Sequence, residues 1–207
     1  CEMTILESET RFVGRVYHVD YELPLRLSRL DSSRTAADRL RLAYLETGGS
    51  ELDEANGDRT RTIAPSIVLL GPGDRLDIGS RRAQGVVVDF EPGFINALLS
   101  IPRLREPELL EGTVRQDAYL LRPFLESERT GKVLPLEMRQ ETFIRAGLAN
   151  IVKEGTIQRD RNWPCRTRAY LIELLFQLRL AIEQVSTPAA TEEHGLYGRA
   201  LTIIRER

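Results

Sequence analysis

Few residues of this chain have the types and spacing that catalysis or metal binding requires. The two histidines, His18 and His194, are far apart in the sequence, and Cys1 and Cys165 form no pair with metal-ligand spacing. The chain contains no Gly-x-Ser-x-Gly nucleophile motif, and its Gly71-Pro72-Gly73 turn lacks the Gly-Lys-Ser/Thr of a phosphate-binding loop. The sequence therefore predicts no metal, no cofactor and no catalytic residue, and indicates that the protein is not an enzyme.

A group of arginines around Trp163 has the composition of a nucleic-acid contact. These arginines are Arg159, Arg161, Arg166 and Arg168. Acidic residues Glu154 and Asp160 lie in the same stretch, and a Trp-Pro pair where a helix starts is more typical of packing between two helices. The 29 Lys and Arg against 31 Asp and Glu give a formal net charge of −2. Because such a chain has no basic field, we expect it to bind nucleic acid poorly on its own.

The segments that must position any binding residue fall into two parts of the chain. In the first part, apolar residues recur with the two-residue period of β-strands. From Val13 to about Phe90, apolar residues alternate with polar ones, as Leu23, Leu25 and Leu27 do. Turn signals such as Asn56-Gly57-Asp58 separate these runs. The pattern predicts a small antiparallel barrel or sandwich.

The second part, after Pro92, has the period of helices. A short helix is predicted over Phe94–Leu99, and the proline-rich stretch Ile101–Leu136 is expected to be irregular. Two long helices should follow, one from about Glu137 to Ile157 and one from near Asn162 to about Gln184. Together the two parts predict an α+β fold, a β-barrel followed by a helical pair.

The second long helix carries an apolar seam with coiled-coil spacing. The seam consists of Leu171, Leu174, Leu178, Ala181 and Val185, and a second apolar face beside it holds Ile172, Leu175, Phe176 and Ile182. Either the helix is buried on most sides within its own chain, or one face forms an interface with a second subunit. We predict the second arrangement, a homodimer formed through the seam.

The ends of the chain favour a cytoplasmic protein with a further domain. Residues 186–193 are small, polar and proline-bearing, as in a linker, and a new helical pattern continues to Arg207 without a terminating glycine. The start of the chain lacks the features of a secretory signal. The longest uncharged stretch, Thr62–Gly73, is too short to span a membrane.

Several segments, in order, resemble the AraC/XylS family of bacterial transcription regulators. Arg41–Gly48, Ile63–Asp74 and Val86–Asn96 resemble strands of its N-terminal domain; Leu121–Leu125, Trp163 and Tyr170–Arg179 are similar to its helical pair; and His194–Arg207 is similar to the first helix of its DNA-binding domain. Each segment is degenerate, and the resemblance lies mainly in their order.

The resemblance implies an effector-sensing and dimerisation domain of a DNA-binding regulator. Residues 1–115 would form a cupin-like jelly roll that binds a small effector, such as a sugar or an organic acid. Residues 116–185 would be the helical dimerisation segment, 186–193 the linker, and 194–207 the start of a truncated helix-turn-helix domain, through which alone the protein would contact DNA. Metal cupins carry histidine ligands just after this Pro-Gly turn, and Pro72–Ile78 contains none.

The candidate ligand-binding residues are those whose side chains could point into the barrel. They are Leu42, Tyr44, Leu76, Ile78, Arg26 and Arg41. The two arginines would suit an anionic effector if they faced inward, although their alternation with leucines favours a solvent-facing position. Two other functions remain open: a cupin-fold enzyme of the sugar isomerase or dioxygenase type acting on a small metabolite, and a binding or scaffold protein with no DNA role.

Overall fold

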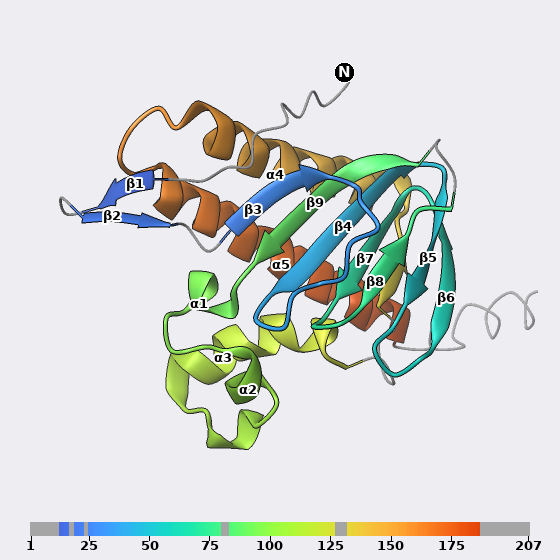
Figure 1. The fold of residues 1–207 in the computed structure, drawn as a ribbon, viewed down its shortest axis with the longest axis horizontal. Coiled ribbons are helices and arrows are strands. Elements are labelled where there is room, and N and C mark those ends of the chain that lie inside the picture. The colour runs from blue at the N-terminus through green and yellow to red at the C-terminus, as the bar shows by residue number, and fades with distance from the viewer. Residues whose placement is uncertain (1–12, 17–18, 23–24, 80–82, 127–131, 187–207) are drawn as a thin grey trace, which may run out of the picture.

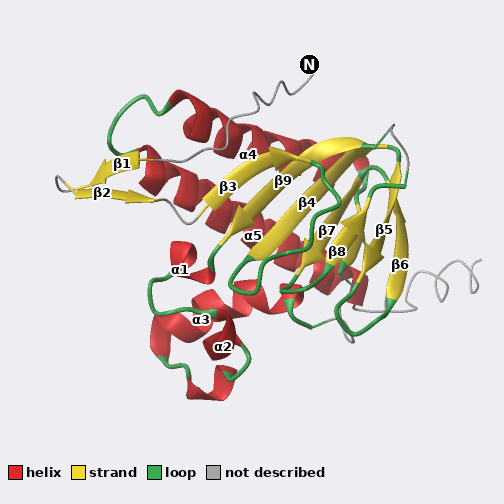
Figure 2. Ribbon diagram, viewed as in Figure 1, coloured by secondary structure: helices red, strands yellow, loops and turns green. Residues whose placement is uncertain are grey.

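The computed structural model describes residues 13–16, 19–22, 25–79, 83–126 and 132–186. The predictions for His18, His194, Cys1, the linker and the terminal helix therefore lie outside the described residues. Within them, two antiparallel sheets face each other, and two long helices cover the outer face of the larger sheet (Figures 1 and 2).

The strands form two main sheets and a separate hairpin. The larger sheet has the order β10 (Val133–Pro135), β7 (Ser66–Leu70), β4 (Leu40–Thr47), β9 (Gln84–Phe90) and β3 (Leu25–Arg29). The smaller sheet has the order β6 (Arg59–Ile63), β5 (Gly49–Asp53) and β8 (Arg75–Asp77). The hairpin pairs β1 (Val13–Val16) with β2 (Val19–Glu22).

The strand order is that of a jelly roll. A single bridge from Arg34 to Arg75 places the segment before β4 at the free edge of β8, where a fourth strand of the smaller sheet would lie. Apart from β10, which adds an edge strand beside β7, the two sheets then read β7-β4-β9-β3 and β6-β5-β8-Arg34, with every described pair antiparallel. This is the double-sheet arrangement of a jelly roll. The predicted α+β fold with an antiparallel jelly roll is confirmed.

Strand β4 separates two hydrophobic clusters because it is buried on both faces. Between the sheets lie Ala43, Leu45, Leu52, Val68, Leu70, Leu76 and Val87. On the opposite face, Leu40, Leu42 and Tyr44 join a larger cluster that includes the helices. Since successive side chains of a strand point to opposite faces, this alternation assigns each β4 residue to one cluster.

The helices follow β9, and two of them lie within Ile101–Leu136, where an irregular stretch was predicted. They are α1 (Pro92–Ile95), α2 (Ile101–Leu104), α3 (Gly112–Leu121), α4 (Met138–Ile157) and α5 (Trp163–Ser186), with 3₁₀ turns η1 (Pro107–Leu109) and η2 (Arg122–Phe124). The prediction of an irregular stretch over Ile101–Leu136 is wrong for α3. Its ten residues fit between Pro107 and Pro123 without placing a proline inside the helix.

Helices α4 and α5 form the predicted helical pair and pack closely. A capping box between Glu137 and Gln140 starts α4, and Gln158, with a φ of 46°, ends it. A Cβ at Gly147 would lie 3.5 Å from Leu174 of α5, so this glycine marks a close approach of the two helices. Trp163 is buried at the start of α5, as expected for packing between helices.

The apolar seam of α5 is buried within its own chain. Leu171, Leu174, Leu178 and Ala181 are at most 6% exposed and belong to the large cluster. The side chain of Val185 lies outside the described residues. The prediction that these residues form a dimer interface therefore needs correction, because the sheet and α4 already cover them. The large cluster also joins residues from both sides of the predicted boundary at 115, which falls inside α3.

Candidate functional site

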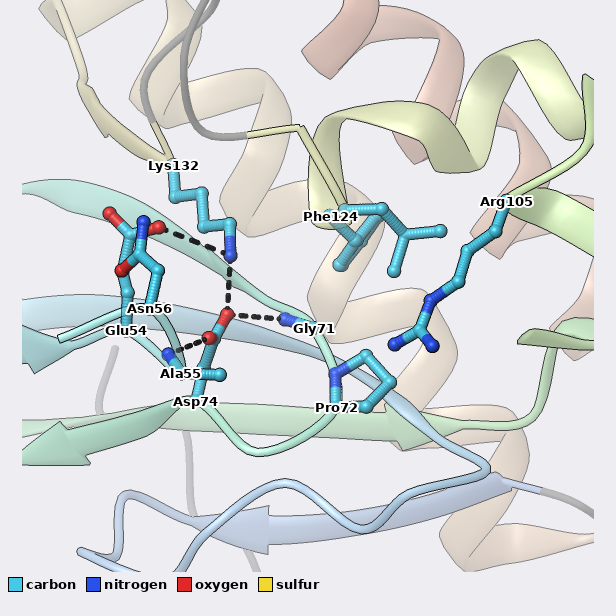
Figure 3. Close-up of a pocket in the computed structure, with 10 residues that line it drawn as sticks. Glu54, Ala55, Asn56, Gly71, Pro72, Asp74, Arg105, Phe124 and Lys132 are labelled. Atoms are coloured by element: carbon cyan, nitrogen blue, oxygen red, sulfur yellow. Dashed lines mark hydrogen bonds and ion pairs between the residues drawn. The ribbon is translucent and has the colours of Figure 1, made fainter. Parts of the chain in front are cut away.

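A cavity of about 200 Å³ opens at one end of the sandwich. It lies where the β5–β6 hairpin and the turn after β7 approach η2 and the residue before β10 (Figure 3). Its lining residues are Glu54, Ala55, Asn56, Gly71, Pro72, Asp74, Arg105, Phe124, Leu125 and Lys132. A second hollow, beside Arg103, Glu106 and Leu109, is lined mainly by exposed side chains and contains no buried polar group.

Asp74 organises the wall of the cavity. One carboxylate oxygen accepts a hydrogen bond from the Ala55 N–H at 2.8 Å, and the other accepts from the Gly71 N–H at 2.7 Å. The second oxygen also accepts from Nζ of Lys132 at 2.7 Å. Since Asp74 is 1% exposed, these bonds replace its hydration and fix the β7–β8 turn against the hairpin.

Lys132 and Glu54 form a second buried charged contact of the cavity. Nζ of Lys132 lies 3.3 Å from Oε2 of Glu54, and both side chains are 7% exposed. This contact is an ion pair, but Oε2 accepts no hydrogen bond from a described residue. A buried carboxylate oxygen without a hydrogen bond is unusual in a folded protein, and here it lies on the wall of a cavity. Its charge is balanced by the ion pair with Lys132.

The rest of the cavity combines an apolar wall with a cationic rim. Phe124 is buried and packs edge-on against Phe90, with ring centroids 5.7 Å apart. Figure 3 shows the Arg105 guanidinium beside Pro72, across the cavity from Glu54 and Lys132. Arg105 is exposed, and its guanidinium makes no hydrogen bond or ion pair with the described residues. The cavity thus has a buried ion pair at one end and a cation at the other.

A second buried polar cluster, around Arg41, engages every guanidinium nitrogen, whereas Oδ1 of Asp89 accepts no hydrogen bond from a described residue. Nε and Nη2 of Arg41 donate to Asp89 at 3.2 and 2.6 Å, and Nη1 donates to Asp31 at 3.1 Å and to Ser33. Burial alone would lower the pKa of Arg41, but its bonds to Asp89 and Asp31 raise it overall. Burial alone would raise the pKa of Asp31, but hydrogen bonds from Ser33 and the Arg41 charge lower it overall. All three guanidinium nitrogens are engaged, so this cluster holds the fold together.

The six predicted ligand-binding residues do not line the cavity. Leu42 and Tyr44 face the helices, and the Tyr44 hydroxyl donates to Glu141 at 3.1 Å. Leu76 lies in the cluster between the sheets. Ile78 is partly exposed, and Arg26 is exposed on β3.

The solvent-facing position expected for Arg41 is wrong. Arg41 is 5% exposed, because β4 is buried on both faces and its alternation does not separate core from solvent. The expectation for Arg26 agrees with its exposure.

Two of the residues that line the cavity are marked by features of the sequence. Asp74 directly follows the Gly71-Pro72-Gly73 turn, and Lys132 is one of two lysines in the chain, the other being Lys153. The pairing of Lys132 with Asp74 spans 58 positions, and no local pattern in the sequence indicates it.

One of the arginines near Trp163, Arg166, is held by acidic neighbours. Arg166 donates to Glu154 at 2.7 Å and to Asp160 at 2.9 Å. These ion pairs hold the turn between α4 and α5. No helix among the described residues is long and apolar enough to cross a membrane. The described residues also contain no group of three or more His, Cys, Asp or Glu side chains placed to hold a metal ion.

The fold and the cavity define a jelly-roll domain with a helical pair and a small internal site. No protein-family model matches the chain, and no curated protein matches it. Solved structures that resemble it include apo ToxT from Vibrio cholerae, at 15% identity and a TM-score of 0.45, covering 78% of this chain and 58% of that one.

Two further solved structures resemble the chain with similar sequence identity, TM-score and coverage. Wild-type ToxT from the same organism with a bound unsaturated fatty acid has 16% identity and a TM-score of 0.40, covering 78% of this chain and 55% of that one. The AraC-like transcriptional activator CuxR has 15% identity and a TM-score of 0.37, covering 74% of this chain and 49% of that one. The chain thus spans about half the length of these proteins. The AraC-like class suggested by the sequence is represented among its structural neighbours.

Proposed function

We propose that this chain is the effector-sensing and dimerisation part of an AraC-like transcription regulator, and that the effector occupies the Glu54–Lys132 cavity. The observation that carries the proposal is the position of Lys132. Its side chain forms the cavity wall, and its main chain leads through the three residues of β10 to α4, which starts at Met138. One short segment therefore connects the binding site to the helical pair.

The contacts of this segment supply a route from the cavity to α4. The main-chain oxygen of Lys132 accepts from the Leu69 N–H at 2.8 Å, and the Leu136 N–H donates to Pro65 at 3.0 Å. Beyond β10, α4 is tied to β4, because Arg145 pairs with Glu46 at 2.9 Å. An effector that changes the position of Lys132 shifts the balance between two arrangements of α4 against the sheet.

The dimer interface is proposed on the outer face of α5. Phe176 is 53% exposed and Leu180 is 50% exposed, and with Ala169 and Ile172 they follow one side of the helix. This stripe replaces the buried seam as the surface available to a second copy. A symmetric contact of two such stripes would pair each α5 with its partner.

Contact with DNA is assigned to the part that follows the linker. Residues 194–207 resemble the first helix of a DNA-binding domain and lie outside the described residues. The net charge of −2 supports this assignment, because the chain carries no general attraction for a polyanion.

The proposal is tested by a metabolite screen on three proteins: wild type, Glu54→Gln, and the control Arg139→Gln on the exposed start of α4. We expect at least one small metabolite to raise the melting temperature of the wild type and of the control, but to have less effect on Glu54→Gln. A screen with no stabilising metabolite, or with equal stabilisation of all three proteins, would count against an effector in this cavity.

The enzyme alternative has no specific observation in its favour. A cupin enzyme without a metal would need a convergent acid and base, and Asp74 is the nearest carboxylate to Lys132. Both oxygens of Asp74 are already held by three donors. Asp74 is therefore a structural residue in this site.

A further inference from the structure

We infer that Tyr119 of α3 is a positioning residue, which passes a displacement of the cavity wall at Phe124 to the C-terminal end of α5. This inference rests on the proposed effector role of the cavity and adds a second route from it, directed to α5 rather than α4. It depends on three features: the contacts of Tyr119 with α5, the burial of those contacts, and the helical connection between Tyr119 and Phe124.

Tyr119 holds α5 by both its ring and its hydroxyl group. Cζ of the Arg179 guanidinium lies over the Tyr119 ring, 3.9 Å from the ring centroid. The Tyr119 hydroxyl donates to Oε1 of Glu183 at 2.5 Å, and Nε of Arg179 donates to the same oxygen at 3.1 Å. These three side chains, which we call the Tyr119 clamp, join α3 to one side of α5 by a cation–π contact and two charge-assisted hydrogen bonds.

The partial burial of Arg179 makes it dependent on the clamp. The Arg179 side chain is 16% exposed, and its Nη1 is buried and donates to no described residue. Because removing a charged group from water is unfavourable, the guanidinium needs the ring and Glu183 as compensation. A cation over an aromatic ring also gains more when it is shielded from water. Loss of the Tyr119 side chain should therefore release Arg179 from this position.

The clamp acts on the last turns of α5. Arg179 and Glu183 lie in this segment, and the helix ends at Ser186. On the inner face of the same turns, Ala181 and Ile182 belong to the large hydrophobic cluster. The core therefore fixes one face of the segment and the clamp fixes a second. Residues 187–193, predicted as the linker, follow directly in the sequence.

A continuous helical segment connects Tyr119 to the cavity wall. Helix α3 runs to Leu121, and η2 follows at Arg122 without an intervening loop. The Arg122 N–H donates to the carbonyl oxygen of Ala118, so the hydrogen bonds of α3 continue into η2. Phe124 lines the cavity and is less than two helical turns from Tyr119. We therefore expect a displacement of Phe124 to move Tyr119 with it.

The two routes from the cavity begin at different residues and can be separated. Lys132 leads through β10 to α4, and Phe124 leads through α3 to the end of α5. A substitution of Tyr119 interrupts the second route and leaves the contacts of Lys132 unchanged.

Substitution of Gly71 tests the second route without a ligand. A Cβ on Gly71 would lie 2.5 Å from the carbonyl oxygen of Phe124, so Gly71→Ala displaces η2 from the side of the cavity. Gly79→Ala is the matched control, because a Cβ there meets nothing within 4 Å. Both substitutions are made in the wild type and in Tyr119→Leu, which lacks the ring and the hydroxyl. The amide NMR shifts of residues 179–186 report on the end of α5.

In the wild-type background, Gly71→Ala should shift these amides and Gly79→Ala should leave them unchanged. In the Tyr119→Leu background the shift caused by Gly71→Ala should be lost. Tyr119→Phe keeps the ring over Arg179 and should retain part of the shift, and Arg115→Gln, exposed on the same helix, should retain all of it.

Two results would overturn the inference: no shift in the wild-type background, or the same shift with and without the Tyr119 side chain. The second result is the one expected if Tyr119 is only structural, because Tyr119→Leu would then change α5 independently of Gly71. If Gly71→Ala does not fold, Phe124→Leu provides the displacement of η2, and the same comparison applies.

These measurements contain no metabolite, so they fail independently of the effector screen. A stabilising metabolite in the screen, together with no response at residues 179–186, overturns this inference and leaves the effector cavity in place. A screen without any stabilising metabolite overturns the effector role itself, and with it the regulatory meaning of the Tyr119 clamp.

Discussion

At the residue scale, three charged side chains hold together segments that are distant in the sequence. Asp74 connects the hairpin at Ala55, the turn at Gly71 and the strand that follows Lys132. Lys132 in turn lies between Asp74 and Glu54. The two acids are not equivalent, because Asp74 is fully hydrogen-bonded and Glu54 retains a buried oxygen that accepts no hydrogen bond from a described residue.

Removing the charge of Asp74 should destabilise the protein strongly. Asp74→Asn leaves Lys132 buried with a weaker partner and replaces an acceptor by a donor, so we expect a loss of about 3 kcal/mol in the free energy of unfolding. Urea denaturation measures this loss. Asp58→Asn, in the exposed hairpin turn, is the matched control and should change stability by less than about 0.5 kcal/mol. Similar losses in the two variants would contradict the structural role of Asp74.

The hydroxyl of Tyr44 contributes a pH-dependent part of the stability. Burial and the adjacent Glu141 raise the pKa of Tyr44 above its ordinary value. The folded state therefore keeps this proton at a pH where the unfolded chain has lost it, and stability falls as the pH rises above about 10.

Tyr44→Phe tests this contribution. We expect the wild type to exceed the variant by about 1 kcal/mol at neutral pH, the scale of one hydrogen bond, and this advantage to shrink above pH ~10. Urea denaturation at a series of pH values measures it. An advantage that stays constant or grows at alkaline pH would show that folding does not raise the pKa of Tyr44.

At the element scale, the turn after β7 is in main-chain contact with η2. A Cβ on Gly71 would lie 2.5 Å from the carbonyl oxygen of Phe124. This oxygen belongs to the main chain of η2, so it could make room for a Cβ only if η2 moved. Phe124 of η2 forms part of the apolar wall of the cavity. The position therefore requires glycine because of the close approach.

Gly71→Ala should consequently lower stability and ligand affinity together. We expect a loss of about 2 kcal/mol, within the range for overpacked sites, and weaker binding of any ligand that contacts Phe124. Gly79→Ala is the control, because a Cβ there meets nothing within 4 Å. Thermal unfolding with and without ligand compares the two variants. A stable Gly71→Ala protein with unchanged ligand affinity would show that the turn after β7 does not shape the cavity.

The sequence predicted the order of the elements better than the direction of their side chains. The hairpin turn at Asn56-Gly57 and both long helices are confirmed, because local turn residues and helical spacing determine them. Alternation misplaced Arg41, because β4 is covered by a sheet on one face and helices on the other. The cavity residues were missed because Glu54, Asp74 and Lys132 come from separate segments that only the tertiary fold brings together.

At the scale of the whole molecule, α5 has an inner face that supports the core and an outer face with exposed apolar side chains. The seam predicted for dimerisation is on the inner face, and Phe176 and Leu180 are on the outer face. Spacing alone did not distinguish these faces, because both are apolar over the same turns of the helix.

Substitutions on the two faces should have opposite consequences. The double variant Phe176→Glu/Leu180→Glu should be a folded monomer, whereas Leu174→Glu should fail to fold because it places a charge in the core. Light scattering after size exclusion gives the mass, and circular dichroism reports the fold. A monomeric wild type, or a double variant that remains dimeric, would refute the outer face as the interface.

We expect a ligand in the cavity to act on α4 through β10. Hydrogen exchange of the wild type and of Glu54→Gln, each with and without a stabilising metabolite from the screen, measures this effect. The predicted result is slower exchange in residues 132–145 of the wild type on ligand binding, with little change in the variant. Protection confined to other segments, or equal protection in both proteins, would contradict the claim.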